Sequence, residues 1–188
     1  MRRPVTVSPV LPTLGTLTSL PPAEHPELLG DPVARALAAW PHAAEVAVVE
    51  IDPSLADTAA MSQAYDVPMT VSANCVVVAG RRAGEERVAA CVVRADTRAD
   101  VNNLVKRELD VRKASFLAMD RAVEESGMAY GGITPVGLPG DWRLLVDARC
   151  VDIDVAVVGS GLRRSKLLLP GARLADLPGA EVVEGLAG

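Results

Sequence analysis

Aromatic residues are scarce in this chain. Phe, Trp and Tyr make up only 3% of the 188 residues, whereas hydrophobic residues as a whole make up 49%. The core must therefore be built from Val, Leu and Ala, and the many short Val- and Ala-rich runs favour a fold of mixed strands and helices. No run reaches the roughly 18 apolar residues of a membrane-spanning helix, and prolines interrupt the N-terminal segment, so we expect neither a membrane span nor a signal peptide.

Residue types that commonly bind metals are also few. The three cysteines, Cys75, Cys91 and Cys150, are odd in number and widely spaced, with no CxxC pair. We interpret them as reduced core thiols, which predicts a cytoplasmic protein without a metal site. The two histidines, His25 and His42, both lie in the first quarter of the chain. We therefore expect no cofactor and no catalytic histidine.

The chain has no excess of positive charge. It carries 19 Lys and Arg against 24 Asp and Glu, a formal net charge of −5. This argues against broad electrostatic binding of nucleic acid, because contacts with many phosphates need clustered Lys and Arg. A small basic patch directed at one end of an RNA remains compatible with this charge.

The length of 188 residues fits one domain. Residues 1–30 are rich in Pro, Thr and Leu and predict an extended N-terminal arm, and residues 31–188 form the predicted domain. The order of helices and hairpins lacks a regular βαβ alternation, so we predict an α+β fold whose mixed or antiparallel, barrel-like sheet is surrounded by helices. Strands are expected at residues 45–51, 74–80, 88–93, 143–147, 155–158 and 166–169, and helices at 32–40, 56–65, 100–109 and 120–126.

The most unusual segment is Gly131-Gly132-Ile133-Thr134-Pro135-Val136-Gly137. Gly131 and Gly132 have no Cβ, so a ligand can approach their backbone closely. Thr134 adds a hydroxyl, Pro135 fixes the local backbone, and Gly137 restores freedom. The pattern predicts a rigid loop whose N–H groups suit an oxyanion or a phosphate oxygen, although a Gly-Gly pair alone is also typical of a plain hairpin turn.

This segment resembles the GGxSPxG loop of the YbaK and prolyl-tRNA synthetase editing domains, with Thr134 in place of Ser. Three flanking segments agree in order with the same family. Residues 56–67 resemble its early helix, residues 145–147 its strand followed by an acid, and residues 155–161 its late strand followed by Gly. The resemblance covers about residues 31–180.

The resemblance implies an enzyme that cleaves the ester between a wrongly attached amino acid and the terminal adenosine of tRNA. Gly131 and Gly132 would position the ester carbonyl and the attacking water through backbone groups, with Thr134 and Asn74 completing the catalytic set. A ribose hydroxyl of the tRNA would assist, so neither a Ser-His-Asp triad nor a metal is needed. Substrate contacts are expected from Pro135, Gly137, Asp147, Gly159, Arg163, Arg164 and Lys166.

Asn74 is the main departure from the family pattern. Active members place a Lys at the start of the strand that corresponds to residues 74–80, and Asn carries no charge. Either another basic residue compensates, or the substrate differs, or hydrolysis is weak. Arg163, Arg164 and Lys166 form a tight basic cluster after the loop and would hold the phosphates of the acceptor end, unless they are simply a solvated strand end. The remaining basic candidates are more typical of solvent-facing charges: Lys106, Arg107, Arg112 and Lys113.

Two function hypotheses follow. The first is a trans-editing hydrolase that removes a wrongly attached amino acid from tRNA. The second is a non-catalytic module of the same fold that binds tRNA acceptor ends, an amino acid or a nucleotide. The expected partner is the acceptor end of an aminoacyl-tRNA. An aminoacyl-tRNA synthetase as a further partner, and a homodimer as the oligomeric state, are left open.

Overall fold

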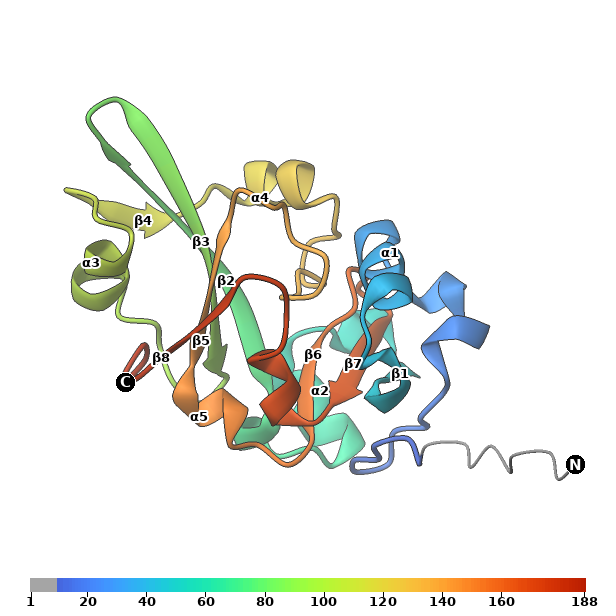
Figure 1. Cartoon of the computed structure of the whole chain (residues 1–188). Coiled ribbons are helices and arrows are strands. Elements are labelled where there is room, and N and C mark those ends of the chain that lie inside the picture. Colours follow the sequence, from blue (N-terminus) through green and yellow to red (C-terminus); the bar gives the residue numbers. More distant parts are fainter. Residues whose placement is uncertain (1–9) are drawn as a thin grey trace, which may run out of the picture.

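The computed structural model describes residues 10–188, which form two β-sheets (Figure 1). The small sheet is antiparallel, in the order β1-β7-β6, with bounds Ala47–Glu50, Ser165–Leu169 and Ala156–Gly159. The large sheet has the order β4-β2-β3-β5-β8, with bounds Ala114–Phe116, Ala73–Arg82, Glu85–Arg94, Arg143–Asp147 and Ala180–Val183. Its first three strands are antiparallel, whereas β5 and β8 add in parallel.

This arrangement confirms the predicted α+β class with a mixed sheet and surrounding helices. The large sheet stays open, and its edges in the described part of the chain are β4 and β8, so the barrel-like closure is not seen. Just before β2 begins, Ser72 pairs with Val157 of β6 in an isolated parallel bridge. The two sheets meet at this bridge, and the candidate site lies beside it.

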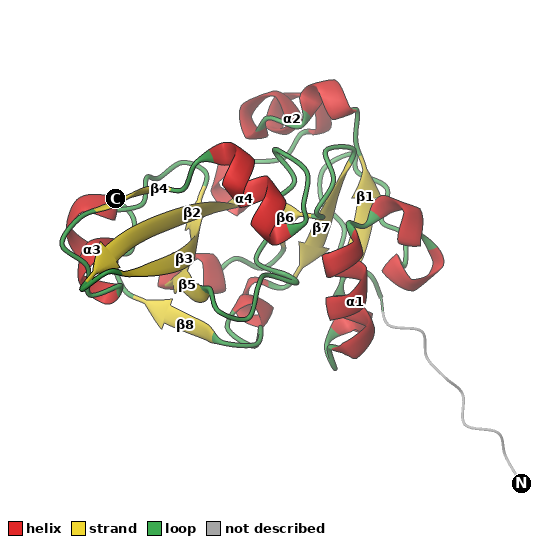
Figure 2. Cartoon of the chain, turned by 90° about the horizontal axis from the view of Figure 1, so that it is seen from above, coloured by secondary structure: helices red, strands yellow, loops and turns green. Residues whose placement is uncertain are grey.

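The helices are short and flank the sheets (Figure 2). Their bounds are Asp31–Ala39 (α1), Thr58–Tyr65 (α2), Lys106–Glu108 (α3), Met119–Ser126 (α4) and Ala148–Val151 (α5), and α3 continues a π-helical turn at Val101–Val105. Asp57 begins α2 because its carboxylate accepts hydrogen bonds from the amides of Ala59 and Ala60. Gly127 ends α4 in a left-handed conformation, with φ of 67°.

The core consists mainly of Val, Leu and Ala, as the scarcity of aromatics predicts. β7 is the central strand of the small sheet, and all five of its residues are buried. Both tryptophans, Trp40 and Trp142, are buried at the same large core cluster. The cysteines are free thiols, and burial raises the pKa of Cys91 and of Cys150 to about 12. Thiols with such a pKa remain protonated and unreactive at neutral pH.

Part of the predicted N-terminal arm packs on the small sheet. Residues 1–9 lie outside the described part of the chain, whereas Leu17, Leu28 and Leu29 are buried. Leu20 also pairs with Val48 of β1 through two backbone hydrogen bonds of 2.9 Å. The described part of this segment therefore covers apolar surface of the domain.

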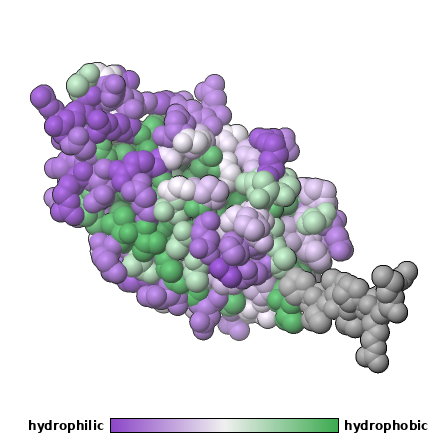
Figure 3. All heavy atoms as spheres, in the orientation of Figure 1, coloured by the Kyte–Doolittle hydropathy of each residue, from purple (hydrophilic) through white to green (hydrophobic). Residues whose placement is uncertain are grey.

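The β2–β3 hairpin projects from the body of the molecule (Figure 1). Its end carries charged residues in the register Arg81 to Glu86 and Arg82 to Glu85. In the space-filling view this end is mostly hydrophilic (Figure 3). Within residues 10–188, none of the helices is long and apolar enough to cross a membrane.

Candidate functional site

A cavity of about 440 Å³ lies where the two sheets meet. Its walls come from the start of α2, the start of β2, the end of β6, β7 and the loop that follows α4. Apolar side chains form much of the lining: Ala56, Met61, Cys75, Val76, Ile133, Val157 and Val158. The polar side chains are fewer: Asp57, Thr58, Ser72, Asn74, Arg163 and Lys166. An apolar chamber with a few polar groups is typical of a small-molecule site.

Gly131 is the glycine of the predicted pair that faces this cavity. Its φ of 75° is in the left-handed region, which explains the need for glycine. Among the hydrogen bonds of residues 10–188, none uses the Gly131 N–H as a donor. The carbonyl oxygen of Gly131 accepts a bond of 3.4 Å from Lys166 Nζ. Gly131 thus lines the cavity, and its amide N–H has no acceptor within residues 10–188.

Gly132 has a structural role, because its backbone N–H and its carbonyl both form hydrogen bonds within the protein. Its N–H donates to Ala129 O at 2.9 Å, and its carbonyl accepts from Gly161 N–H at 2.8 Å. A Cβ at this position would lie 2.7 Å from backbone atoms of Leu162. Gly132 therefore fastens the loop to the β6–β7 turn and is not among the residues that line the cavity.

Gly159 lets the loop lie directly on the end of β6. A Cβ on this residue would be 2.4 Å from Gly132 O and 2.7 Å from Ile133 O. Real Cβ atoms essentially never come closer than 3.0 Å, so only glycine fits here. Gly159 also lines the cavity, so the same residue shapes both the wall and the loop.

The rest of the loop supports the site from behind. Thr134 is fully buried and lies outside the cavity lining, and its hydroxyl has no hydrogen-bond partner in the described chain. Pro135 is buried too, and Gly137 packs against α1, where a Cβ would lie 2.5 Å from Pro32 O. None of these three residues contacts the cavity, although the sequence predicts catalytic or substrate contacts for them.

Asn74 lines the same cavity as Gly131. Its side chain is exposed, and its Oδ1 accepts a hydrogen bond of 3.0 Å from Thr58 Oγ1. Thr58, the first residue of α2, thus orients the side-chain amide of Asn74, the second residue of β2. The structure brings these two predicted residues together although they are separated by 57 positions in the numbering.

The predicted basic cluster divides into three environments. Arg163 lines the cavity, with its guanidinium carbon 5.4 Å from the centre of the Tyr130 ring and a hydrogen bond of 3.3 Å to Pro53 O. Arg164 is exposed and turns away from the cavity to contact Glu27 O. Lys166 is buried at 8% exposure and lines the cavity, so the solvated-strand-end interpretation is wrong for this residue.

Lys166 donates to two backbone carbonyls. Its Nζ lies 3.3 Å from Ala56 O and 3.4 Å from Gly131 O. Burial lowers the pKa of this ammonium, the charge of Arg163 lowers it further, and Asp57 opposes the shift. A buried cation thus sits beside the carbonyl of the cavity-facing glycine.

Comparison with known proteins identifies the family. The profile of the aminoacyl-tRNA editing domain matches residues 52–177, more than half of the chain. This chain belongs to the aminoacyl-tRNA editing domain family. The matched range contains the cavity, the glycine loop and both cavity cations. No curated protein sequence matches the chain.

Solved structures share the fold of this editing domain. One is a crystal structure of a protein proposed to be a trans-editing enzyme for prolyl-tRNA synthetase, with 21% identity and a TM-score of 0.70 over 82% of this chain and 94% of that one. Another is the hypothetical protein APE2540, with 22% identity and a TM-score of 0.66 over 75% of this chain and 90% of that one. At these identities the matches establish the shared fold.

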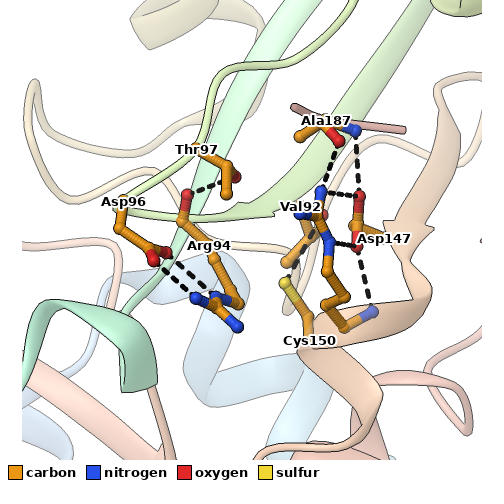
Figure 4. Close-up of polar contacts among 8 residues, drawn as sticks. Val92, Arg94, Asp96, Thr97, Asp147, Cys150 and Ala187 are labelled. Carbon is orange, nitrogen blue, oxygen red and sulfur yellow. Dashed lines mark hydrogen bonds and ion pairs between the residues drawn. The ribbon is translucent and has the colours of Figure 1, made fainter. Parts of the chain in front are cut away.

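Asp147 lies in a separate polar cluster of the editing domain (Figure 4). It precedes α5, and its carboxylate accepts hydrogen bonds of 2.9 Å from both the Arg149 and the Ala187 amides. Burial raises the pKa of Asp147, but the hydrogen bonds from Arg149 and from the two amides outweigh burial and hold the pKa below its ordinary value. Asp147 therefore ties the C-terminal segment to β5 and is not among the cavity residues.

Asp57, Met119 and Tyr130 are among the cavity residues that the sequence did not predict. Asp57 lines the cavity beside Thr58, and the exposed side chains of Met119 and Tyr130 belong to its lining, at 52% and 57% exposure. A signal for Tyr130 was present, because it is a rare aromatic residue directly before the Gly-Gly pair. Asp57 could have been found as the acid that begins a helix.

Proposed function

We propose that this editing domain hydrolyses the ester bond of a wrongly charged aminoacyl-tRNA. The observation that carries the proposal is the convergence of Gly131, Asn74 and Gly159 on one cavity. These residues come from separate elements. The resemblance to editing domains implies a catalytic role for Gly131 and Asn74 and a substrate contact for Gly159. The cavity gives their backbone and amide groups a common place to meet an acyl ester.

The reaction needs no side-chain nucleophile. A water oxygen attacks the ester carbonyl, the bond to the ribose oxygen breaks, and the proton of the water passes to the leaving ribose oxygen. The products are a free amino acid and an uncharged tRNA. Negative charge develops on the carbonyl oxygen during the attack, and the free N–H of Gly131 suits this oxygen.

The lining favours a small or medium-sized amino acid. Ala56, Met61 and the valines of β6 form apolar walls, and an apolar wall separates substrates by about 1–3 kcal/mol per methylene. Tyr130 is an exposed ring at the cavity that suits stacking with the terminal base of the tRNA. Arg163 supplies a positive charge next to this ring for a phosphate of the acceptor end.

The test is deacylation of a panel of mischarged tRNAs under single-turnover conditions. We expect at least one small aminoacyl ester to be cleaved, and we expect Gly131→Val to abolish cleavage. Gly84→Val is the matched control, because Gly84 also has a positive φ of 87° but lies at the hairpin end with open space around it. Equal activity of the two variants would refute a role for the Gly131 backbone.

A second candidate is a binding module without turnover. It is favoured by the neutral Asn74, which the resemblance to editing domains aligns with a Lys of active members. In this case the protein would bind acceptor ends in the same cavity and leave every ester intact, even with enzyme in excess over tRNA. The single-turnover assay therefore separates the two candidates.

A further inference from the structure

We propose that Lys166, delivered from β7, supplies the positive charge that stabilises the ester oxyanion in this cavity. The inference rests on the proposed function and adds a residue to it. The charge would thus come from β7 of the small sheet, whereas β2 of the large sheet contributes the neutral Asn74 to the same cavity. The reaction is the same hydrolysis, and Lys166 contributes a hydrogen bond and a charge without forming a covalent bond.

The geometry gives Lys166 one donor to spare. An ammonium carries three N–H groups, and two of them serve the carbonyls of Ala56 and Gly131 at 3.3 and 3.4 Å. No third acceptor contacts Nζ within residues 10–188. Since Lys166 lines the cavity, the third donor is available to an oxygen of a bound molecule.

The position of Lys166 Nζ suits contact with the ester rather than with a phosphate. Lys166 is buried, and its bond to Gly131 O places the ammonium at the glycine whose amide is proposed to meet the ester. Arg163 is more exposed and lies against Tyr130, whose side chain is open to solvent. A phosphate of the acceptor end therefore meets Arg163, and the acyl carbonyl reaches the deeper Lys166.

The fold itself gains little from this buried charge. No carboxylate in residues 10–188 forms an ion pair with Lys166, and Arg163 adds repulsion. A buried ammonium without a paired acid destabilises a protein, and an apolar side chain of similar size is often better tolerated. The three residues that follow Lys166 in β7, Leu167 to Leu169, are apolar and buried. The presence of a lysine at this buried position in this chain therefore points to a function in the cavity.

The test uses two substitutions of Lys166 in the full chain. Lys166→Gln keeps amide donors for the two carbonyls but removes the charge, and Lys166→Met removes both. Arg35→Met on the exposed face of α1 is the control for loss of a cation. For each variant we would measure the single-turnover deacylation rate, the affinity for the uncharged tRNA and the midpoint of thermal unfolding.

We expect Lys166→Gln to lower the rate by about 10²- to 10³-fold, as for loss of an oxyanion donor, with tRNA affinity within about twofold of the wild type. We expect the unfolding midpoint of Lys166→Met to equal or exceed that of the wild type. A Gln variant within about threefold of the wild-type rate would overturn the assignment, as would a lower rate accompanied by a lower midpoint and weaker tRNA binding. A wild-type protein that cleaves no ester would overturn both this assignment and the proposed function, whereas an active wild type with an active Gln variant would overturn the assignment alone.

Discussion

Substitution of Gly159 by alanine tests whether the close packing of the glycine loop (residues 131–137) against β6 matters for catalysis. The added Cβ would lie 2.4 Å from Gly132 O, and ordinary contact begins at 3.4 Å, so the loop and the strand must separate by about 1 Å. Both atoms in conflict with the Cβ, Gly132 O and Ile133 O, belong to the backbone, so no side chain can rotate away. The amide of Gly131, one residue earlier in the same loop, would move with them.

A misplacement of about 1 Å at a catalytic group lowers a rate by roughly 10²-fold. Overpacking of a buried position costs about 1–3 kcal/mol of unfolding free energy. We therefore expect Gly159→Ala to remain folded in urea titrations, with a modestly lower stability, and to lose about two orders of magnitude in the single-turnover deacylation rate.

The matched control is Gly140→Ala, because a Cβ there meets open space and Gly140 is not among the glycines with positive φ. It should behave as the wild type in both measurements. A Gly159→Ala variant with wild-type activity and unchanged stability would refute the inferred close contact between the loop and β6.

Three further predictions concern other parts of the molecule. Asp147→Ala should lower the free energy of unfolding by about 2–4 kcal/mol, because it removes a helix cap and leaves the Ala187 amide without its partner. This decrease in stability should have its full size above the ordinary carboxyl pKa and should shrink as the pH falls through the lowered pKa of Asp147. Urea titrations at several pH values would measure it. The stability advantage of Lys166→Met over the wild type should be largest at pH values below the lowered pKa of Lys166. It should vanish as the pH rises towards 10.5, because the wild type then buries a neutral amine facing Arg163 and Asp57. A stability advantage that does not change with pH would contradict a buried charge. Asn74→Lys should raise the deacylation rate if Asn74 occupies the cation position of active relatives, and an unchanged or lower rate with intact folding would count against that placement.

Much of the fold could be predicted from the sequence, because local signals carry it. The apolar run at β2 and the charged hairpin after it indicate two paired strands, and Gly127 marks the end of α4. The glycine loop was recognisable since its residue types are unusual as a set. The parallel pairing of β5 with β3, and of β8 with β5, was not predictable, because such pairing depends on contacts between segments far apart in the chain.

Local patterns also misplace side chains whose surroundings come from tertiary structure. The segment around Arg163, Arg164 and Lys166 has the composition of a solvated strand end, yet β7 lies between two neighbours and its lysine is buried. Asp147 ends a strand, a position that the resemblance associates with substrate contacts, but its carboxylate holds α5 and the C-terminal segment. Lys166 contacts Ala56 and Gly131, and Asp147 contacts Ala187; these partners are distant in sequence, so spacing alone gives no signal for them.

The most direct measurement is a crystal structure with a non-hydrolysable analogue, an adenosine that carries a small amino acid through a 3′-amide. We expect the acyl group to lie between the apolar walls, with its carbonyl oxygen about 3 Å from the Gly131 nitrogen. An analogue bound with its carbonyl away from Gly131, or bound outside this cavity, would contradict the proposed role of the Gly131 amide.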